Sequence, residues 1–214
     1  MPNQLQKLLF PLLGFPGRTA PALRLDGRKL QRSTVISCEL DALPGPRLFP
    51  QDPARRGEVE EAERWGDEVL QEAARSLGRW AARRDSAALV SFAEDSKLAL
   101  PPALARGLAR IAGPLIVRTY SIADDEVRTI LSQLPAMLDR VDGWIAAGVI
   151  GSEPPNAADF QLATSLRLLL AFADLREAIE SRPAGQLALR VVPDYSPRFA
   201  PVFPREWLGG ILSE

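Results

Sequence analysis

The sequence predicts an α+β fold that is mostly helical, with a small β-hairpin near the N-terminus and an all-α body after it. Two short strand-like segments flank Asp26-Gly27, which is a strong signal for a hairpin with a two-residue turn. Apolar residues then recur at helical spacing over most of residues 54–192. The chain has 214 residues, of which 46% are hydrophobic, so it can bury a substantial core.

The composition excludes several classes of function. The net charge is −1, with 26 basic and 27 acidic residues interleaved, so we expect no nucleic-acid partner and no membrane partner. The absence of histidine excludes Ser-His-Asp and Cys-His catalysis, and with one cysteine we expect no metal site. A lone cysteine, a poor signal-peptide pattern and the lack of a long apolar run together predict a cytoplasmic protein.

The N-terminal quarter predicts a hairpin followed by a helix. The strands are residues 22–25 and 28–31, and Ser33 is the expected N-cap of a helix that reaches Leu43. The expected inner face of this helix consists of Val35, Ile36, Leu40 and Leu43. Cys38 lies more than a turn inside the helix, where we expect a buried, inert thiol. The free N–H groups and the serine hydroxyl at this helix start suit a carboxylate ligand.

The segment before the hairpin is short. Residues 3–13 predict one helix broken near Pro11, followed by a Gly/Pro-rich loop. A two-stranded hairpin with one helix is marginally stable by itself and exposes a backbone edge. We therefore expect the first helix or a partner to cover that edge, or the native protein to begin upstream of Met1.

The remaining chain predicts a linker, an all-α domain and a tail. The expected parts are residues 1–46 for the N-terminal domain, 47–53 for the linker, 54–192 for the helical domain and 193–214 for a proline-rich tail. The helices are predicted over 54–84, 87–93, 102–121, 124–147, 156–172 and 184–192. We expect Pro135 to interrupt or bend its helix, and we expect Phe199, Phe203 and Trp207 to anchor the tail on the body.

The helix that begins at Asn156 has every expected capping device. Asn156 can accept a hydrogen bond from the backbone of Asp159, whose carboxylate can reach back to the Asn156 N–H. Pro155 and Phe160 have the spacing of a hydrophobic staple. The following residues are apolar nearly all round, which predicts a helix buried at the centre of the protein.

Three features together resemble the glutathione S-transferase family. They are the Asn-x-x-Asp helix start, the Leu-Phe-Pro linker at residues 48–50, and the order Thr19-Ala20-Pro21, hairpin, Ser33-helix. The resemblance implies an incomplete thioredoxin-like domain that binds glutathione, followed by the family's all-α domain. It also implies a homodimer, and an apolar electrophile bound on the helical domain.

The resemblance implies a role for five residues in binding glutathione. The Ala20 backbone would pair with the cysteinyl group, Pro21 would be the cis proline, and Ser33 would hold the γ-glutamyl carboxylate. Arg32 replaces the Glu or Gln that usually contacts the glutathione amine, and Gln31 is a possible substitute for that contact.

The catalytic residue remains unknown. In the family a Tyr, Ser or Cys at the end of the first strand activates the thiol, and residues 1–20 are too few for two strands and a helix. Tyr120 and Tyr195 belong to the helical part and the tail, where packing is the default role. Three functions stay open: a glutathione transferase, a non-catalytic binding or interaction protein of the same fold, and a helical regulator unrelated to glutathione. The sequence does not indicate which electrophile binds.

Overall fold

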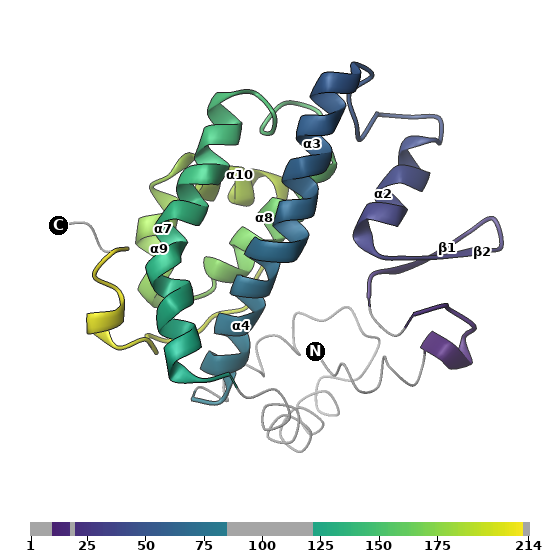
Figure 1. Cartoon of the computed structure of the whole chain (residues 1–214). Helices are drawn as coiled ribbons and strands as arrows, with labels where there is room; N and C mark the ends of the chain where they lie inside the picture. The colour runs from purple at the N-terminus through teal and green to yellow at the C-terminus, as the bar shows by residue number, and fades with distance from the viewer. Residues whose placement is uncertain (1–9, 18–19, 85–121, 212–214) are drawn as a thin grey trace.

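The computed structural model describes residues 10–17, 20–84 and 122–211. It confirms a mostly helical α+β fold, in which the hairpin and one helix lie beside a helical body (Figure 1). The elements are β1 (Ala22–Leu25), β2 (Arg28–Gln31), α2 (Ser33–Asp41), α3 (Pro53–Trp65), the π-helical segment η1 (Gly66–Leu70), α4 (Gln71–Ala82), α7 (Asp124–Ala146), α8 (Ala157–Leu169), α9 (Ala173–Glu180), α10 (Pro183–Val191) and the 3-10 turn η2 (Arg205–Trp207). The helices predicted over 87–93 and 102–121 lie outside the described residues.

The predicted hairpin is confirmed, with the expected two-residue turn. Asp26 and Gly27 both have positive φ, 48° and 81°, as the right-handed twist of the strands requires. The helix α2 covers one face of the hairpin, and residues 10–17 lie against the other (Figure 1). The Lys29 ammonium donates to the Leu13 carbonyl at 2.6 Å. Of the helix predicted over 3–13, only residues 10–12 are helical within the described part.

The predicted details of α2 are partly wrong. Ser33 is the first residue inside the helix and not its N-cap, which is Arg32 at φ 78° without a side-chain capping bond. Three members of the predicted inner face are 38–40% exposed, namely Val35, Leu40 and Leu43. Cys38 is also exposed. Within the part of the chain that the structure describes, the neighbours of α2 are a two-stranded hairpin and the flank of α3, which are too few to bury so wide an apolar arc.

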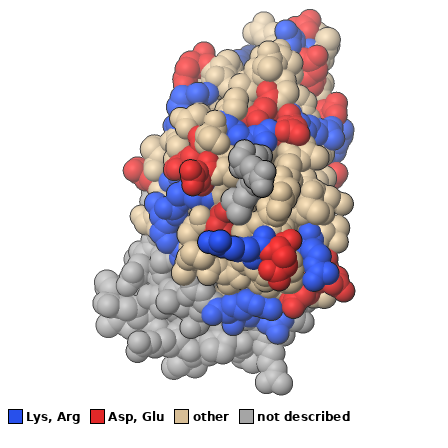
Figure 2. Space-filling view, turned by 90° about the vertical axis from the view of Figure 1, so that its left-hand side faces the viewer, with Lys and Arg blue, Asp and Glu red and all other residues tan. Residues whose placement is uncertain are grey.

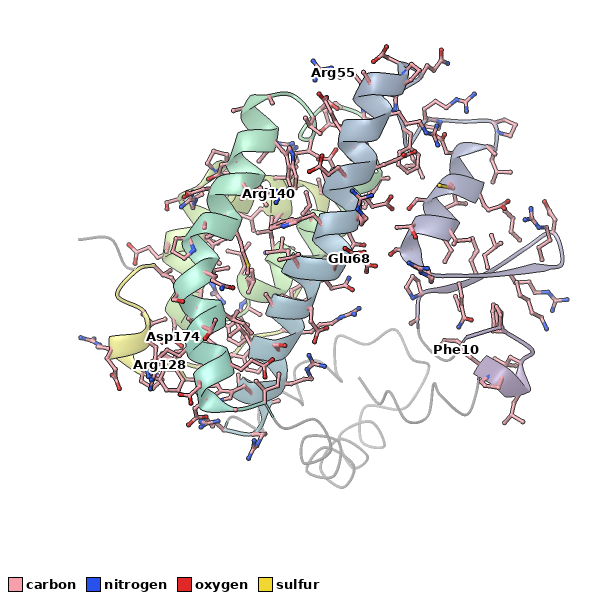
Figure 3. The ribbon with its side chains drawn as sticks, in the orientation of Figure 1. Phe10, Arg55, Glu68, Arg128, Arg140 and Asp174 are labelled. Carbon is pink, nitrogen blue, oxygen red and sulfur yellow. The ribbon has the colours of Figure 1, made fainter. Side chains whose placement is uncertain are left out.

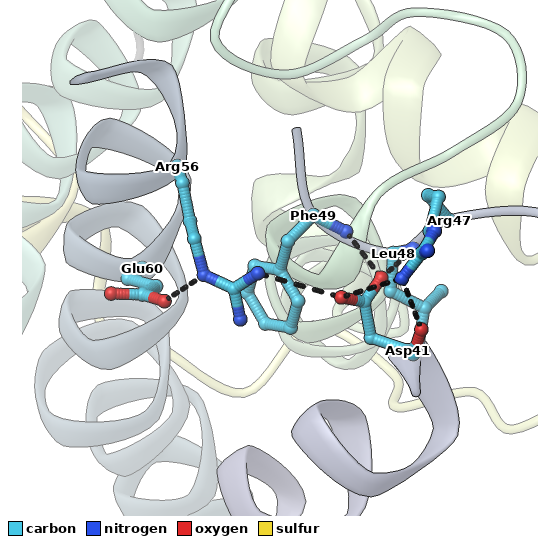
Figure 4. Close-up of polar contacts among 6 residues, drawn as sticks. All are labelled: Asp41, Arg47, Leu48, Phe49, Arg56 and Glu60. Carbon is cyan, nitrogen blue, oxygen red and sulfur yellow. Dashed lines mark hydrogen bonds and ion pairs between the residues drawn. The ribbon is translucent and has the colours of Figure 1, made fainter. Parts of the chain in front are cut away.

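The predicted linker fixes α2 to the helical body through the carboxylate of Asp41 (Figure 4). This carboxylate is buried and accepts the N–H groups of Leu48 at 2.8 Å and Phe49 at 3.0 Å. The Arg56 guanidinium lies 3.5 Å from Asp41 and 4.7 Å from the centre of the Phe49 ring, and it also pairs with Glu60. Phe49 therefore enters the core while its backbone stays hydrogen-bonded.

The long helix predicted over 54–84 is confirmed as the continuous series α3, η1 and α4. The sequence does not predict the π-helical segment in its middle. Gly66 begins that segment directly against α8, where a Cβ atom would lie 3.0 Å from the Leu162 side chain. The helical spacing predicts an inner stripe at residues 59, 62, 66, 69, 70, 73, 77, 80 and 81. All of these are buried except Val69, which lies within η1 and is 36% exposed.

The later helices agree with the sequence in position but differ in two details. Pro135 lies inside α7 without interrupting it. The helical spacing predicts an apolar stripe of five residues on this helix, of which Ile145 is half-buried and the other four are buried, namely Leu131, Leu134, Leu138 and Val141. The sequence analysis missed α9, which separates the predicted central and final helices. None of the described helices has the length and apolar character required to cross a membrane.

The aromatic residues of the tail complete the core, as predicted. Phe199 stacks on Phe172 with ring centroids 4.5 Å apart, and Phe203 stacks on Trp80 at 5.4 Å. The Trp207 ring lies 5.5 Å from Trp80. The backbone is held as well, since the Phe199 N–H donates to the Ala171 carbonyl at 2.8 Å.

The capping box at the start of α8 is confirmed in both directions. The Asp159 N–H donates to the Asn156 side chain at 3.1 Å, and the Asp159 carboxylate accepts the Asn156 N–H at 2.8 Å. The other carboxylate oxygen of Asp159 accepts the Gly151 N–H at 2.7 Å. Phe160, expected in the staple, is 45% exposed.

Replacing Asp159 by alanine is expected to destabilise the protein by about 2–4 kcal/mol, because it leaves two backbone N–H groups without their acceptor in a buried place. Urea unfolding followed by far-UV circular dichroism measures this loss. Asp125→Ala is the matched control, since Asp125 lies in the first turn of α7 and its side chain is 93% exposed. Equal losses in the two variants would contradict the structural role of Asp159.

Candidate functional site

The open end of the hairpin brings together the five residues predicted from the sequence to bind glutathione. Ala22 and Gln31 form the last pair of the two strands. The residues just outside this pair, Ala20-Pro21 on one strand and Arg32-Ser33 on the other, therefore lie at the same end. The Ala20–Pro21 peptide bond is cis, as the resemblance implied.

The start of α2 has backbone donors that the helix itself does not use. The first hydrogen bond from this turn is that of the Ile36 N–H to the Arg32 carbonyl, at 3.1 Å. The N–H groups of residues 33–35 precede it and have no helical acceptor. No acidic residue lies in this first turn, and the adjacent Arg32 is exposed. The dipole of α2 and the guanidinium of Arg32 both attract negative charge, so this end of α2 can hold an anion.

Two further groups at this end are available to a ligand. Within the described residues, the Ser33 hydroxyl makes no hydrogen bond, and neither does the backbone of Ala20. Ser33 is half-buried and Ala20 is exposed. The arrangement can therefore offer a hydroxyl, several N–H groups and a carbonyl to one extended ligand.

Gln31, the fifth predicted residue, has a structural contact. It is buried, and its amide oxygen accepts the N–H of Gly17. Gln31 thus ties the preceding loop to the end of β2. Its predicted contact with a ligand amine stays a prediction.

A buried carboxylate behind α2 was missed by the sequence analysis. Glu63 of α3 is 3% exposed and accepts a hydrogen bond from the Ser37 hydroxyl at 2.8 Å. Within the described residues no cation lies within ion-pair distance of it. The available signal was positional, since Glu63 lies one turn from both Val59 and Gly66 on the apolar stripe of the long helix.

The surroundings of Glu63 favour its neutral form. Burial is the largest cause and raises the pKa of its carboxyl group above the ordinary 4.5. The hydrogen bond from Ser37 opposes this rise, whereas the charges of Asp67 and Glu60 add to it. The ionised carboxylate of Glu63 is therefore disfavoured, because the hydrogen bond from Ser37 does not make up for the loss of water around the charge.

Of the three side chains considered for catalysis, Cys38 and Tyr195 lie in the described part of the chain. Cys38 faces outward in a shallow hollow formed by α2 residues. Partial burial and the charge of Glu63 raise its thiol pKa, so the reactive thiolate is disfavoured. Tyr195 belongs to the tail, where its ring lies 5.5 Å from the Arg167 guanidinium. Tyr120 lies outside the described residues.

In Figure 2, Lys and Arg side chains alternate with Asp and Glu over the face that is shown, without a broad area of one sign. In the described ranges, no group of three metal-ligating side chains comes together.

Comparison with known proteins does not assign the chain to a family. No protein-family model, curated protein or solved structure matches it. Any function therefore has to be argued from the geometry of the site and from the resemblance described above.

Replacing Glu63 by glutamine should stabilise the protein at neutral pH by about 1–2 kcal/mol, because it removes a buried charge of raised pKa. A raised carboxyl pKa means that the folded state binds more protons than the unfolded state above pH 4.5. The contribution of this group to stability therefore falls as the pH rises from 4.5 through the folded pKa, and the variant should lose that dependence.

Urea unfolding at pH 4.5 and pH 8 tests this expectation. Glu68→Gln is the matched control, because Glu68 lies on the same long helix in an exposed position (Figure 3). An advantage for Glu63→Gln that is the same at both pH values would contradict the assigned cause.

Proposed function

We propose that this chain is a glutathione S-transferase-like protein that binds glutathione at the open end of the hairpin. The observation that carries the proposal is the cis Ala20–Pro21 peptide beside the uncapped start of α2. An extended peptide ligand could pair its backbone with Ala20 and place a carboxylate at the N–H groups of the helix.

The local charge supports a carboxylate as the group bound at α2. Glutathione has two carboxylates, and the γ-glutamyl one is assigned to Ser33 and the N–H groups behind it. Arg32 adds a cation at the same place. Arginine at this position, in place of Glu or Gln, attracts the carboxylate of glutathione and not its amine. The contact with the amine is therefore the part of the family pattern in which this chain differs.

In the proposed reaction, the glutathione thiol loses its proton to solvent water, and the thiolate attacks an apolar electrophile on the helical body. A carbon–sulfur bond forms and the leaving group departs with its electron pair. No described residue is assigned to stabilise the thiolate. A cytoplasmic location and a homodimer belong to the same proposal.

A non-catalytic binding protein of this fold is the second candidate. The raised thiol pKa of Cys38 and the contact of Tyr195 with Arg167 favour it, because they leave the described part of the site without a candidate that activates a thiol. Binding of glutathione is common to both candidates, and only turnover separates them.

Ser33→Ala should weaken glutathione binding about tenfold, because it removes a hydrogen bond to a charged group. Isothermal titration calorimetry of the full chain measures the dissociation constant. Thr34→Ala is the matched control, since it removes a hydroxyl from the next residue of the same helix. A glutathione analogue with an amide in place of the γ-glutamyl carboxylate should bind wild type and Ser33→Ala equally weakly.

The outcomes separate the candidates. Binding with conjugation of an aryl chloride, followed by absorbance, supports the transferase. Binding without conjugation supports the binding protein. Absence of glutathione binding, or equal binding by wild type and Ser33→Ala, refutes both.

A further inference from the structure

Within the described residues, the hairpin has neighbours on both faces, and none of them pairs with the outer edge of β1. On one side, Arg28 of β2 forms two hydrogen bonds with Glu39 of α2, at 2.6 and 2.7 Å. On the other side, Lys29 binds the Leu13 carbonyl. Within the described residues the sheet contains only these two strands. Among the described residues, the part of the hairpin left without a neighbour is therefore a strand edge and not a sheet face.

The register shows which backbone groups this edge exposes. In a hairpin with a two-residue turn, the pair next to the turn exchanges both hydrogen bonds, and the pairs then alternate. Leu25 and Leu23 are thus the bonded positions of β1, and Ala22 and Arg24 direct their N–H and C=O groups outward. The outward groups of Ala22 and Arg24 form no hydrogen bond to any described residue. Two donors and two acceptors at strand spacing form a template for a further strand.

The charge of this edge indicates what kind of strand fits. Residues 22–33 contain four cationic side chains and one carboxylate, and one of the four, Arg28, is already paired with Glu39 of α2. Arg24 lies directly opposite Lys29 in the hairpin, and such like-charge pairs are destabilising. Lys29 is bound to the Leu13 carbonyl, whereas Arg24 is exposed and has no ion pair within the described residues. A carboxylate on the open side of Arg24 would offset this repulsion.

We propose that the outer edge of β1 binds an extended acidic polypeptide, which adds a third strand to the hairpin. The backbone of the partner pairs with Ala22 and Arg24, and a Glu or Asp of the partner pairs with the Arg24 guanidinium. A second copy of this chain fits less well, because pairing β1 with itself would add more arginine to the same edge. The proposal is independent of glutathione binding.

Three fluorescein-labelled eight-residue peptides test the proposal by fluorescence anisotropy with the full chain. The first alternates valine and glutamate, the second alternates valine and lysine, and the third is the first with all of its backbone amide nitrogens methylated. The glutamate peptide should bind at least tenfold more tightly than either of the others. Equal binding of the lysine peptide, or of the methylated peptide, overturns the proposal.

Two variants locate the binding at β1. Arg24→Glu should reverse the preference and bind the lysine peptide. Arg24→Pro should abolish binding of both, because it removes an N–H that faces away from β2, a place where an edge strand tolerates proline. Arg64→Glu is the charge-matched control, since Arg64 is exposed on α3, and it should bind like wild type.

Three measurements complete the test. Far-UV circular dichroism shows whether each variant is folded. If Arg24→Pro does not fold, the peptide preference of Arg24→Glu decides whether β1 is the binding edge. Light scattering that shows a dimer lost in Arg24→Pro would assign the edge to a second copy and overturn the proposal. Glutathione binding by Arg24→Glu should remain at the wild-type level, so that failure here and failure at Ser33 are distinguishable.

Discussion

The arrangement of the helical body depends on the carboxylate of Asp159. This group is fully buried, and it holds the N–H groups of Asn156 and Gly151 at the point where the chain turns into α8. The Asn156 side chain donates in turn to the Val149 carbonyl. Burial raises the pKa of Asp159, and the two backbone donors oppose that rise. A buried anion is tolerated here because backbone dipoles solvate it, and α8 is thereby fixed in the position against which α3, η1, α4 and α10 pack.

The attachment of the hairpin unit differs in kind from the packing of the body. The body is joined by apolar contacts around α8, whereas α2 meets it through the Asp41 carboxylate and through the Ser37–Glu63 hydrogen bond. Only Phe49 of the linker enters the main core. The proposed glutathione site thus belongs to a small unit that depends on a few polar contacts, one of which includes a carboxylate that burial disfavours.

Several of the structural features that depend on residues close together in the sequence were predicted correctly. The Asp26-Gly27 turn, the Asn156 cap, the long periodic helices and the aromatic tail were all recognisable, because each depends on residues close in sequence or on one strong pattern. The π-helical segment at Gly66 and the exposure of Cys38 were not recognisable. The first depends on how closely α8 approaches Gly66, and the second on how much of α2 the hairpin covers. At the candidate site the sequence indicated the residues around Ser33, but it could not show that Gln31 is engaged by Gly17 or that Glu63 is buried behind them.

The stacking of the tail has a consequence for how the protein forms during synthesis. Trp80, near the end of α4, receives Phe203 and Trp207 from the last part of the chain, and Phe172 receives Phe199. Until these residues leave the ribosome, the side of α4 and α8 that they cover stays open to water. The early helices therefore have to wait until residues 199–207 have been made, and only then do these aromatic rings complete the core of the body.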